Sequence, residues 1–263
     1  MRSHNKLHFL LLTAALLLTG SIFGQARQFP LPDYIYSRPV IPGTRFGAEY
    51  STYDIEKHKY YKRTQTIRAN GEFAFNDYFS IRGDLPWTRK KETNTETRTR
   101  FDNMGLGLHL ANPNGNWIPL GGLDFTLATG NEKTGIGSKR IFNLEPFVGI
   151  GYHGDLFSIA AIGRYNSQAN KQFKEDPAKK DDFERAWIAN LNLGMSFTYL
   201  DLLLEYQYKY LYDPDPKRQS FHSIAPGLNV KLSNFMLGVS IPYALSKERP
   251  YDIGAIVRIY GRF

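Results

Sequence analysis

The feature that most constrains the fold of this 263-residue chain is a two-residue alternation of side-chain character from Gly43 to the C-terminus. It is clearest in the last segment, where Val257 and Ile259 lie on one face of the pattern and Arg258 lies on the other. Side chains of a β-strand point alternately to its two faces. The alternation therefore predicts strands that each have one large apolar face and one small, polar or charged face. A closed barrel in a membrane imposes such a pattern on every strand.

We predict twelve strands that together account for most of the chain after residue 42. They lie near residues 43–54, 64–76, 78–88, 100–112, 119–129, 140–152, 156–166, 185–198, 201–210, 220–232, 235–245 and 252–263. Short connections rich in Asn, Asp and Gly alternate with longer charged connections, such as residues 167–184. Short periplasmic turns opposite long external loops are typical of outer-membrane barrels, and an even strand number places both termini on one side.

Strand length separates a membrane barrel from the soluble alternative. A secreted β-sandwich also alternates, but its strands average about 5–6 residues. Most strands predicted here have about 11 residues or more, close to what a tilted strand needs to cross a bilayer. Aromatic residues also gather near strand ends, as Phe79 and Trp87 do, which is typical of the interfacial girdles of a barrel. The predicted fold class is all-β, a closed antiparallel transmembrane β-barrel.

Composition excludes two other classes of protein. A mean hydropathy of −0.41 and 22% charged residues do not fit a bundle of membrane helices, since each helix needs about 20 apolar residues. The 17 Tyr, 18 Phe and 3 Trp are more aromatic residues than a disordered chain carries. The chain has no cysteine, so neither disulfides nor a lipid-anchored cysteine can contribute.

Residues 1–26 predict a secretory signal peptide. Arg2 and Lys6 precede a Leu-rich stretch, and the small residues Gly24 and Ala26 fit cleavage after Ala26, with cleavage after Gly24 as the alternative. The apolar stretch from residue 7 to residue 18 is too short for an uncleaved membrane anchor. We therefore expect the mature chain in the outer membrane of a diderm bacterium.

Residues 27–42 contain four prolines and cannot form a regular strand or helix. Two interpretations fit this segment. It is a periplasmic leader, which we favour, or it enters the barrel as a plug. The remaining residues, 43–263, form the predicted barrel.

Two segments of the predicted barrel share a pattern. Residues 79–87 and 235–243 each open on Phe and place Pro seven residues later and an aromatic residue eight residues later. Proline cannot donate a hydrogen bond to a strand ladder. We therefore expect Pro86 and Pro242 to end pairing before a loop, with a bulge as the alternative.

Three short motifs carry a resemblance to a known family. They are residues 84–87 (Asp-Leu-Pro-Trp), residues 102–107 (Asp-Asn-Met-Gly-Leu-Gly), and residues 127–131 (Leu-Ala-Thr-Gly-Asn) leading to the Gly-Ile-Gly-Ser of residues 135–138. The chain resembles the bacterial outer-membrane proteins named after the MetA pathway of phenol degradation, although Ala128 and Asn131 stand where that family has proline and aspartate. The resemblance implies an outer-membrane barrel, transporter-like, for small aromatic or hydrophobic compounds, and no catalytic residues.

If the apolar face meets lipid, the opposite face lines the lumen. Charges at membrane depth persist only where they pair or meet water, so this face is either a salt-bridged plug or a wetted, narrow channel, and the sequence leaves both open. The candidate lumen residues are Arg45, Glu49, Arg68, Glu72, Arg82, Asp84, His109, Asp124, Glu145, Arg164, Glu205, Lys209, Lys231, Arg258 and Arg262.

Catalysis finds little support in the sequence. Outside the signal peptide the only histidines are His58, His109, His153 and His222. The Gly-Xaa-Ser-Xaa-Gly motif of serine esterases is absent. We expect no enzymatic activity, no cofactor and no metal site, and a structural hydrogen bond for His109.

The predicted function is an outer-membrane channel or facilitator for passive passage of small solutes. The alternative is a non-conducting surface barrel whose basic external loops, residues 55–63 and 89–98, bind ligands or lipopolysaccharide phosphates. Expected partners are outer-membrane lipid, lipopolysaccharide and the barrel-assembly machinery, with the C-terminal Phe263 as the assembly signal. Export from the cytosol argues against nucleic acid.

Overall fold

A computed structural model describes residues 31–37, 41–57, 60–130, 136–137, 141–170, 185–212, 220–247 and 249–263. The predicted signal peptide lies outside the described residues, as do residues 27–30 and 38–40 of the proline-rich segment. Residues 58–59, 131–135, 138–140, 171–184, 213–219 and 248 of the connections also lie outside them.

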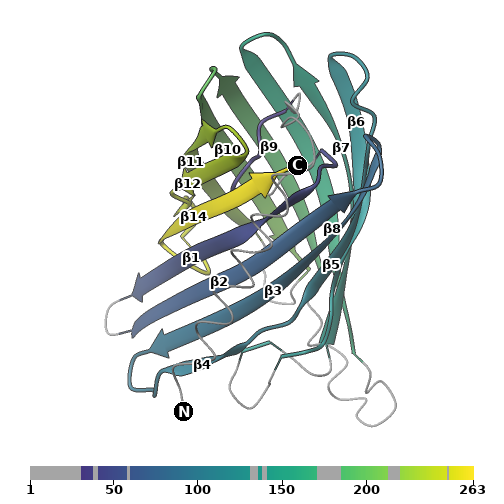
Figure 1. Ribbon diagram of the computed structural model, residues 1–263. Helices are drawn as coiled ribbons and strands as arrows, with labels where there is room; N and C mark the ends of the chain where they lie inside the picture. The colour runs from purple at the N-terminus through teal and green to yellow at the C-terminus, as the bar shows by residue number, and fades with distance from the viewer. Residues whose placement is uncertain are drawn as a thin grey trace, which may run out of the picture.

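The strands form one antiparallel sheet that closes on itself, because β1 pairs with both β2 and β14 (Figure 1). They are β1 (Arg45–Lys57), β2 (Tyr60–Ala74), β3 (Phe79–Glu92), β4 (Arg98–Phe101), β5 (Gly105–Ala111), β6 (Trp117–Thr126), β7 (Ile141–His153), β8 (Phe157–Asn170), β9 (Arg185–Ser196), β10 (Leu200–Leu211), β11 (Ser220–Leu232), β12 (Phe235–Ser240), β13 (Tyr243–Ala244) and β14 (Ile253–Arg262). Because β4 and β5 both pair with β3, and β12 and β13 both pair with β11 and β14, they occupy twelve positions. This confirms the predicted twelve-stranded barrel.

The two prolines of the repeated pattern behave differently. Pro242 falls between β12 and β13, where Ile241 N donates to Pro226 O at 2.9 Å and Gly254 N donates to Pro242 O at 2.7 Å. Pairing resumes at Tyr243, so the expectation that Pro242 ends it is wrong. Pro86 instead lies inside β3, and the interruption is in the facing strand, between β4 and β5. The expectation that Pro86 ends pairing is therefore wrong, because its carbonyl still accepts a hydrogen bond, from Asp102 N at 2.9 Å.

Several strands extend into segments predicted as loops. Residues 55–63 are mostly strand, and β3 continues through Arg89, Lys90 and Lys91 to Glu92. Charge led the sequence reasoning to assign these residues to loops. In the structure the charges pair across the extended hairpins instead, as between Lys62 and Glu92 at 3.3 Å and between Arg63 and Asp54 at 2.7 Å.

Exposure alternates along the strands as the two-residue period predicts. In β3, Ile81, Leu85 and Trp87 are 39%, 48% and 49% exposed, whereas Ser80 and Thr88 are 0% and 1% exposed. The large apolar residues thus cover the outside of the barrel, and polar residues fill its interior. Lipid can cover this apolar outer surface, and closure of the sheet pairs the main-chain groups of its two edge strands.

The short connections lie at the same end of the barrel as the C-terminus (Figure 1). They comprise residues 75–78, 112–116, 154–156, 197–199 and 233–234. Phe263 N donates to Thr44 O at 2.9 Å, which joins the end of the last strand to the start of the first. Among the described residues, no helix has the length and apolar character needed to cross a membrane.

Candidate functional site: the barrel lumen

All fifteen candidate lumen residues lie on the strand faces that point into the barrel. Eight of them are buried: Arg45, Glu49, Glu72, His109, Asp124, Arg164, Glu205 and Arg258. The other seven are partly buried: Arg68, Arg82, Asp84, Glu145, Lys209, Lys231 and Arg262. That these residues line a conducting channel stays a prediction.

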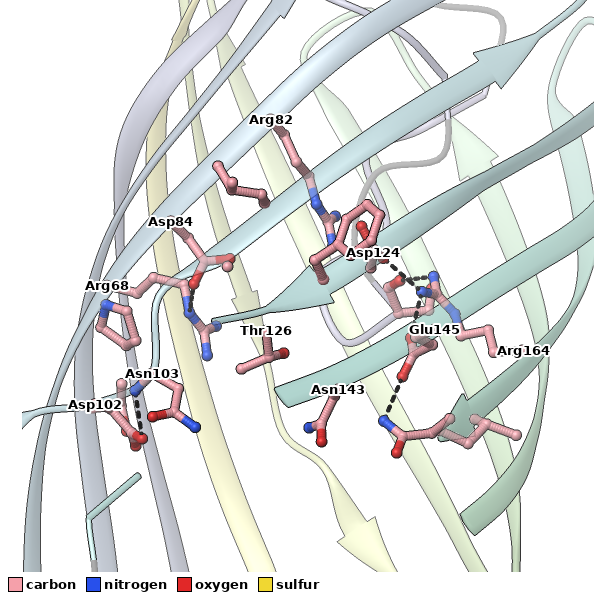
Figure 2. Close-up of a pocket in the computed structure, with 18 of the residues that line it drawn as sticks. Arg68, Arg82, Asp84, Asp102, Asn103, Asp124, Thr126, Asn143, Glu145 and Arg164 are labelled. Carbon is pink, nitrogen blue, oxygen red and sulfur yellow. Dashed lines mark hydrogen bonds and ion pairs between the residues drawn. The ribbon is translucent and has the colours of Figure 1, made fainter. Parts of the chain in front are cut away.

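One half of the lumen wall, β1 to β8, carries ion pairs between strands (Figure 2). Arg68 Nη1 lies 2.6 Å from Glu49 Oε1, directly across the ladder, and Arg68 Nε lies 3.4 Å from Asp84 Oδ2. Pairing between strands, rather than along one strand, follows from the ~13 Å that separates residues four apart in a strand.

A second group of charges continues the same wall around Asp124 (Figure 2). Arg82 Nη2 lies 2.9 Å from Asp124 Oδ2, and Arg164 Nη1 lies 3.4 Å from the same oxygen and 3.1 Å from Glu145 Oε1. Asp124 and Glu145 face each other across β6 and β7, so the two arginines offset the repulsion between adjacent carboxylates. We call Glu49, Arg68, Asp84, Arg82, Asp124, Arg164 and Glu145 the ion-pair ladder.

Two glycines of β5 make room for the ion-pair ladder. Gly107 lies between Arg82 and Asp124 in the register, and a Cβ there would lie 2.3 Å from Asp124 Oδ1. A Cβ at Gly105 would lie 2.3 Å from Asp84 Oδ1. The glycines thus let charged side chains from β3 and β6 reach across β5.

Glu72 anchors a third group of charges. It lies 3.1 Å from Arg45 Nε and accepts a 2.5 Å hydrogen bond from Ser80 Oγ. His109 lies between two acids, with Nδ1 3.6 Å from Glu72 and Nε2 3.6 Å from Asp124. Both distances are longer than those of a hydrogen bond, so the hydrogen bond that we expected for His109 is not formed. His109 instead separates the two carboxylates.

A cavity of about 440 Å³ lies beside the ion-pair ladder. Its lining is mainly polar and includes amides of Asn103, Asn143 and Asn190. Three arginines and four carboxylates also line it: Arg68, Arg82, Arg164, Asp84, Asp102, Asp124 and Glu145. Charges of both signs are therefore within reach of any solute that enters.

Residues 31–37 lie inside the barrel, and not in the periplasm where the favoured leader interpretation would put them. Leu31, Tyr34 and Ile35 are each 1% exposed or less. They pack in an apolar cluster with wall residues that include Ile118 and Leu203. We call residues 31–37 the lumen segment. Sequence alone could not place it, because its prolines remove the periodicity on which placement depends.

Glu205 of β10 holds the middle of the lumen segment. Its Oε1 accepts hydrogen bonds from Ile35 N and Tyr36 N, both at 2.9 Å. Its Oε2 accepts hydrogen bonds from Ser37 N at 2.7 Å and Ser37 Oγ at 2.8 Å. Glu205 is 0% exposed, so these donors replace the water that the buried carboxylate has lost.

Carbonyl groups of the lumen segment are held from other strands. Arg258 Nη2 donates to the carbonyls of Asp33 at 3.0 Å and Tyr34 at 2.9 Å. Asn229 Nδ2 donates to Asp33 O at 3.0 Å, and Arg164 Nη2 donates to the Ser37 carbonyl at 3.0 Å. Arg164 therefore belongs both to the ion-pair ladder and to the wall that holds the segment.

Two side chains of the lumen segment make polar contacts of their own. Asp33 pairs with Arg45 and lies 2.6 Å from Arg262 Nη2. Burial alone would raise the pKa of Asp33, but the guanidinium groups of Arg262 and Arg45 outweigh it and lower the pKa to about 2. The Tyr36 hydroxyl lies 2.8 Å from Ser223 Oγ and 2.7 Å from the Tyr251 hydroxyl.

The lumen segment lies between two cavities. Tyr36 and Ser37 line the 440 Å³ cavity, whereas Leu31 and Pro32 line a second cavity of about 650 Å³ near the short turns. Lys231 also lines this second cavity and pairs with Asp201 at 2.8 Å. The segment therefore occupies the middle of the interior, and each of its ends faces a different cavity.

Sequence reasoning missed several polar residues of the lumen. It considered only charges, and so passed over the buried amides Asn190, Asn192 and Asn229. It also passed over Asp33 and Asp201, which are each 2% exposed. The signal was present for all but Asp33, because each of the others lies on the inward parity of its strand.

Among the residues that the structure describes, no group of three or more His, Asp or Glu side chains could hold a metal ion. The expected absence of enzymatic activity stays a prediction.

Comparison with known proteins supports the fold. A scan of protein-family models finds no match to this chain and a search of curated proteins finds none either, so the resemblance to the phenol-degradation family is not confirmed. The chain is similar in structure to the β domain of the Bordetella autotransporter BrkA, with 11% identity, a TM-score of 0.57, and coverage of 84% of this chain and 100% of that one.

Two porins are similar to the same degree. The KdgM porin, solved in complex with disordered oligogalacturonate, shares 11% identity at a TM-score of 0.53, over 82% of this chain and 99% of that one. The NanC porin shares 9% identity at a TM-score of 0.51, over 84% and 98%. The chain thus has the fold of outer-membrane β-barrels.

Proposed function

We propose that this chain is an outer-membrane channel for passive passage of small polar solutes, with its lumen narrowed by its own residues 31–37. The observation that carries the proposal is the polar cavity of about 440 Å³ inside a barrel with an apolar exterior. A purely structural barrel could fill this space with side chains, as small barrels do. The porin-like fold is consistent with this function.

The lining of the cavity favours particular solutes. Its three arginines pair with Asp84, Asp124 and Glu145, so the wall is nearly neutral overall but strongly polar. A solute with both a positive and a negative group can exchange contacts with such pairs at little net cost. We therefore propose zwitterionic or neutral polar solutes, in preference to the aromatic or hydrophobic compounds that the family resemblance implied.

Solute flux into liposomes tests this proposal. Vesicles that contain the refolded mature chain should admit a small zwitterion, such as glycine betaine, faster than a similar-sized aromatic solute, such as benzyl alcohol after correction for its leak through protein-free vesicles. Weak contacts with the wall would allow both entry and release. Equal fluxes for both, or none above protein-free vesicles, would contradict the proposal.

For targeting and assembly, we propose the route that the sequence predicts. Removal of residues 1–26 would deliver the chain to the outer membrane of a diderm bacterium. Phe263 and the last strand would be recognised by the barrel-assembly machinery. Basic residues at the external ends of the hairpins, such as Lys62 and Arg63, would lie near lipopolysaccharide phosphates.

One observation favours the alternative, a non-conducting surface barrel. The lumen segment is held by charged and polar side chains from strands on several sides. If it never leaves, the two cavities would stay separate. A variant with weakened segment contacts distinguishes the two cases, because a channel gains conductance and a filled barrel does not.

A further inference from the structure

The barrel wall holds the lumen segment by its main chain as well as by its side chains. Seven hydrogen bonds join barrel side chains to main-chain atoms of residues 33–37. Glu205 accepts three of them and Arg258 donates two. Main-chain groups are the same in every peptide except at proline. The wall can therefore recognise the backbone of a peptide in addition to its side chains.

The arrangement around Glu205 is specific for a peptide in one conformation. Three successive N–H groups, those of residues 35, 36 and 37, converge on a single carboxylate. Successive main-chain N–H groups form concave sites for anions. Here the protein wall supplies the anion and the segment supplies the N–H groups, so a ligand must have three consecutive residues without proline.

Side chains on other strands donate hydrogen bonds to the carbonyl groups of the segment. Arg258 on β14 and Asn229 on β11 donate to carbonyls at residues 33 and 34, ahead of the N–H groups that bind Glu205. Arg164 on β8 donates to the carbonyl of residue 37, after them. The order of acceptors and donors on the wall fixes both the direction and the register of the bound peptide.

Side-chain contacts add sequence dependence, and Ser37 Oγ meets both Glu205 and Asn192 at 2.8 Å. Asp33 pairs with Arg45 and Arg262, and the Tyr36 hydroxyl meets Gln207 and Ser223. Apolar packing accounts for Tyr34 and Ile35. A peptide with an acidic residue, two apolar or aromatic residues and then a tyrosine would satisfy these positions.

We propose that Glu205, Arg258, Asn229 and Arg164 form a binding site for the backbone of a short peptide, and that residues 31–37 are its resident occupant. A free peptide of this kind takes the site when the segment leaves. The inference goes beyond the proposed function, because peptide binding requires no conduction. It also assigns to Glu205 a role as the main anchor of the ligand.

The test uses the full mature chain with a weakened occupant and an unchanged wall. In the double variant Asp33→Ala, Tyr36→Ala the segment loses the polar contacts of these two side chains, while the four wall residues remain. The probe is a fluorescent heptapeptide with the sequence of residues 31–37, and binding is followed by anisotropy in detergent micelles. A tethered segment competes at an effective concentration of about millimolar, so the unmodified chain should bind the probe at least about tenfold more weakly than the variant.

Two controls separate backbone recognition from adhesion to an apolar surface. A heptapeptide that is N-methylated at the positions of residues 35–37 keeps the same side chains, and it should bind at least about tenfold more weakly because its three donors are lost. Glu205→Gln in the double variant should weaken binding of the unmethylated probe to a similar extent. Gln207→Ala, on the same face of β10, should change it less.

Equal binding of the two peptides, or equal binding with and without Glu205→Gln, would overturn the proposal. So would a folded double variant that binds neither peptide. If the double variant does not refold, Tyr36→Ala alone supports the same comparison, since Asp33 then keeps both arginine partners. Because binding is measured without a bilayer, its failure leaves the channel proposal untouched, and silent bilayers leave this inference untouched.

Discussion

The two halves of the lumen wall solve the problem of buried charge in different ways. From β1 to β8, arginines pair with carboxylates of neighbouring strands and leave a cavity of about 440 Å³. From β9 to β14, Glu205 and Arg258 turn to the main chain of the lumen segment, and little space remains around them. Most charges on the first half are paired within the wall, although Arg45 and Arg164 also contact the segment. On the second half Lys231 pairs with Asp201, but Glu205 and Arg258 need either a peptide or water.

The largest effect should come from removing the negative charge of Glu205, the main anchor of the lumen segment in the second half. Glu205→Gln replaces the carboxylate that accepts four hydrogen bonds from the lumen segment. Hydrogen bonds to charged groups are worth about 1.5–3 kcal/mol each. We expect the segment to be held at least about 2 kcal/mol more weakly, about a thirtyfold change. Hydrogen exchange at the amides of residues 35–37 measures it.

Gln207→Ala is the matched control for this comparison. Gln207 lies on the same face of β10, and its Oε1 accepts a hydrogen bond from the Tyr36 hydroxyl at 3.2 Å. Its loss should change exchange by a much smaller factor. Similar exchange in the two variants would mean that Glu205 is not the principal anchor.

A substitution in the first half should damage the wall itself. Gly107→Ala would place a Cβ 2.3 Å from Asp124 Oδ1 and 3.0 Å from Arg82 Cγ. We expect the Arg82–Asp124 pair to separate, at a cost of about 1–3 kcal/mol in stability, as for other overpacked sites. Denaturant unfolding from micelles measures this cost. Gly83→Ala is the control, because its nearest neighbour would lie at 3.7 Å, and equal destabilisation by both changes would contradict the account.

The sequence could predict the inward-facing charges of both halves, but not the lumen segment that Glu205 and Arg258 bind. The two-residue period placed Arg68, Asp84 and Glu145 on the inward face, since parity follows directly from the pattern. It could not predict that residues 31–37 enter the barrel, because they have no period and their partners are single residues on distant strands. Pro86 was misjudged for a similar reason: its place inside β3 depends on hydrogen bonds made by its carbonyl.

A smaller effect is expected from single charges of the ion-pair ladder. Arg82→Ala, Asp84→Ala and Glu145→Gln each leave an opposite charge with fewer partners beside the cavity. The first should raise cation preference, and the other two should lower it, each by about twofold, since one charge among several changes the local field only modestly. Reversal potentials across a salt gradient report this preference. If none of the three shifts it, the ladder does not line the path of ions.

The smallest effect on how firmly the segment is held should come from the titration of Asp33. The lowered pKa of Asp33, about 2, means that its contribution to holding the segment is complete above the usual carboxyl range. It is lost only as the pH falls from about 4 through about 2. The protection of the amides of residues 35–37, corrected for the intrinsic pH dependence of exchange, should therefore show no step from Asp33 between about pH 5 and pH 8. In Asp33→Asn the acid-dependent step should be missing, and an unchanged step would assign it to another carboxylate.

The central claim is that the barrel is a conduit narrowed by its own lumen segment. Single-channel recording in planar bilayers tests it most directly, with the mature chain and its Glu205→Gln variant compared at equal protein and salt. The account predicts small or rare current steps for the unmodified chain and larger, more frequent steps for the variant. Silence from both chains, each shown to be folded and inserted, would contradict it and favour a barrel that does not conduct.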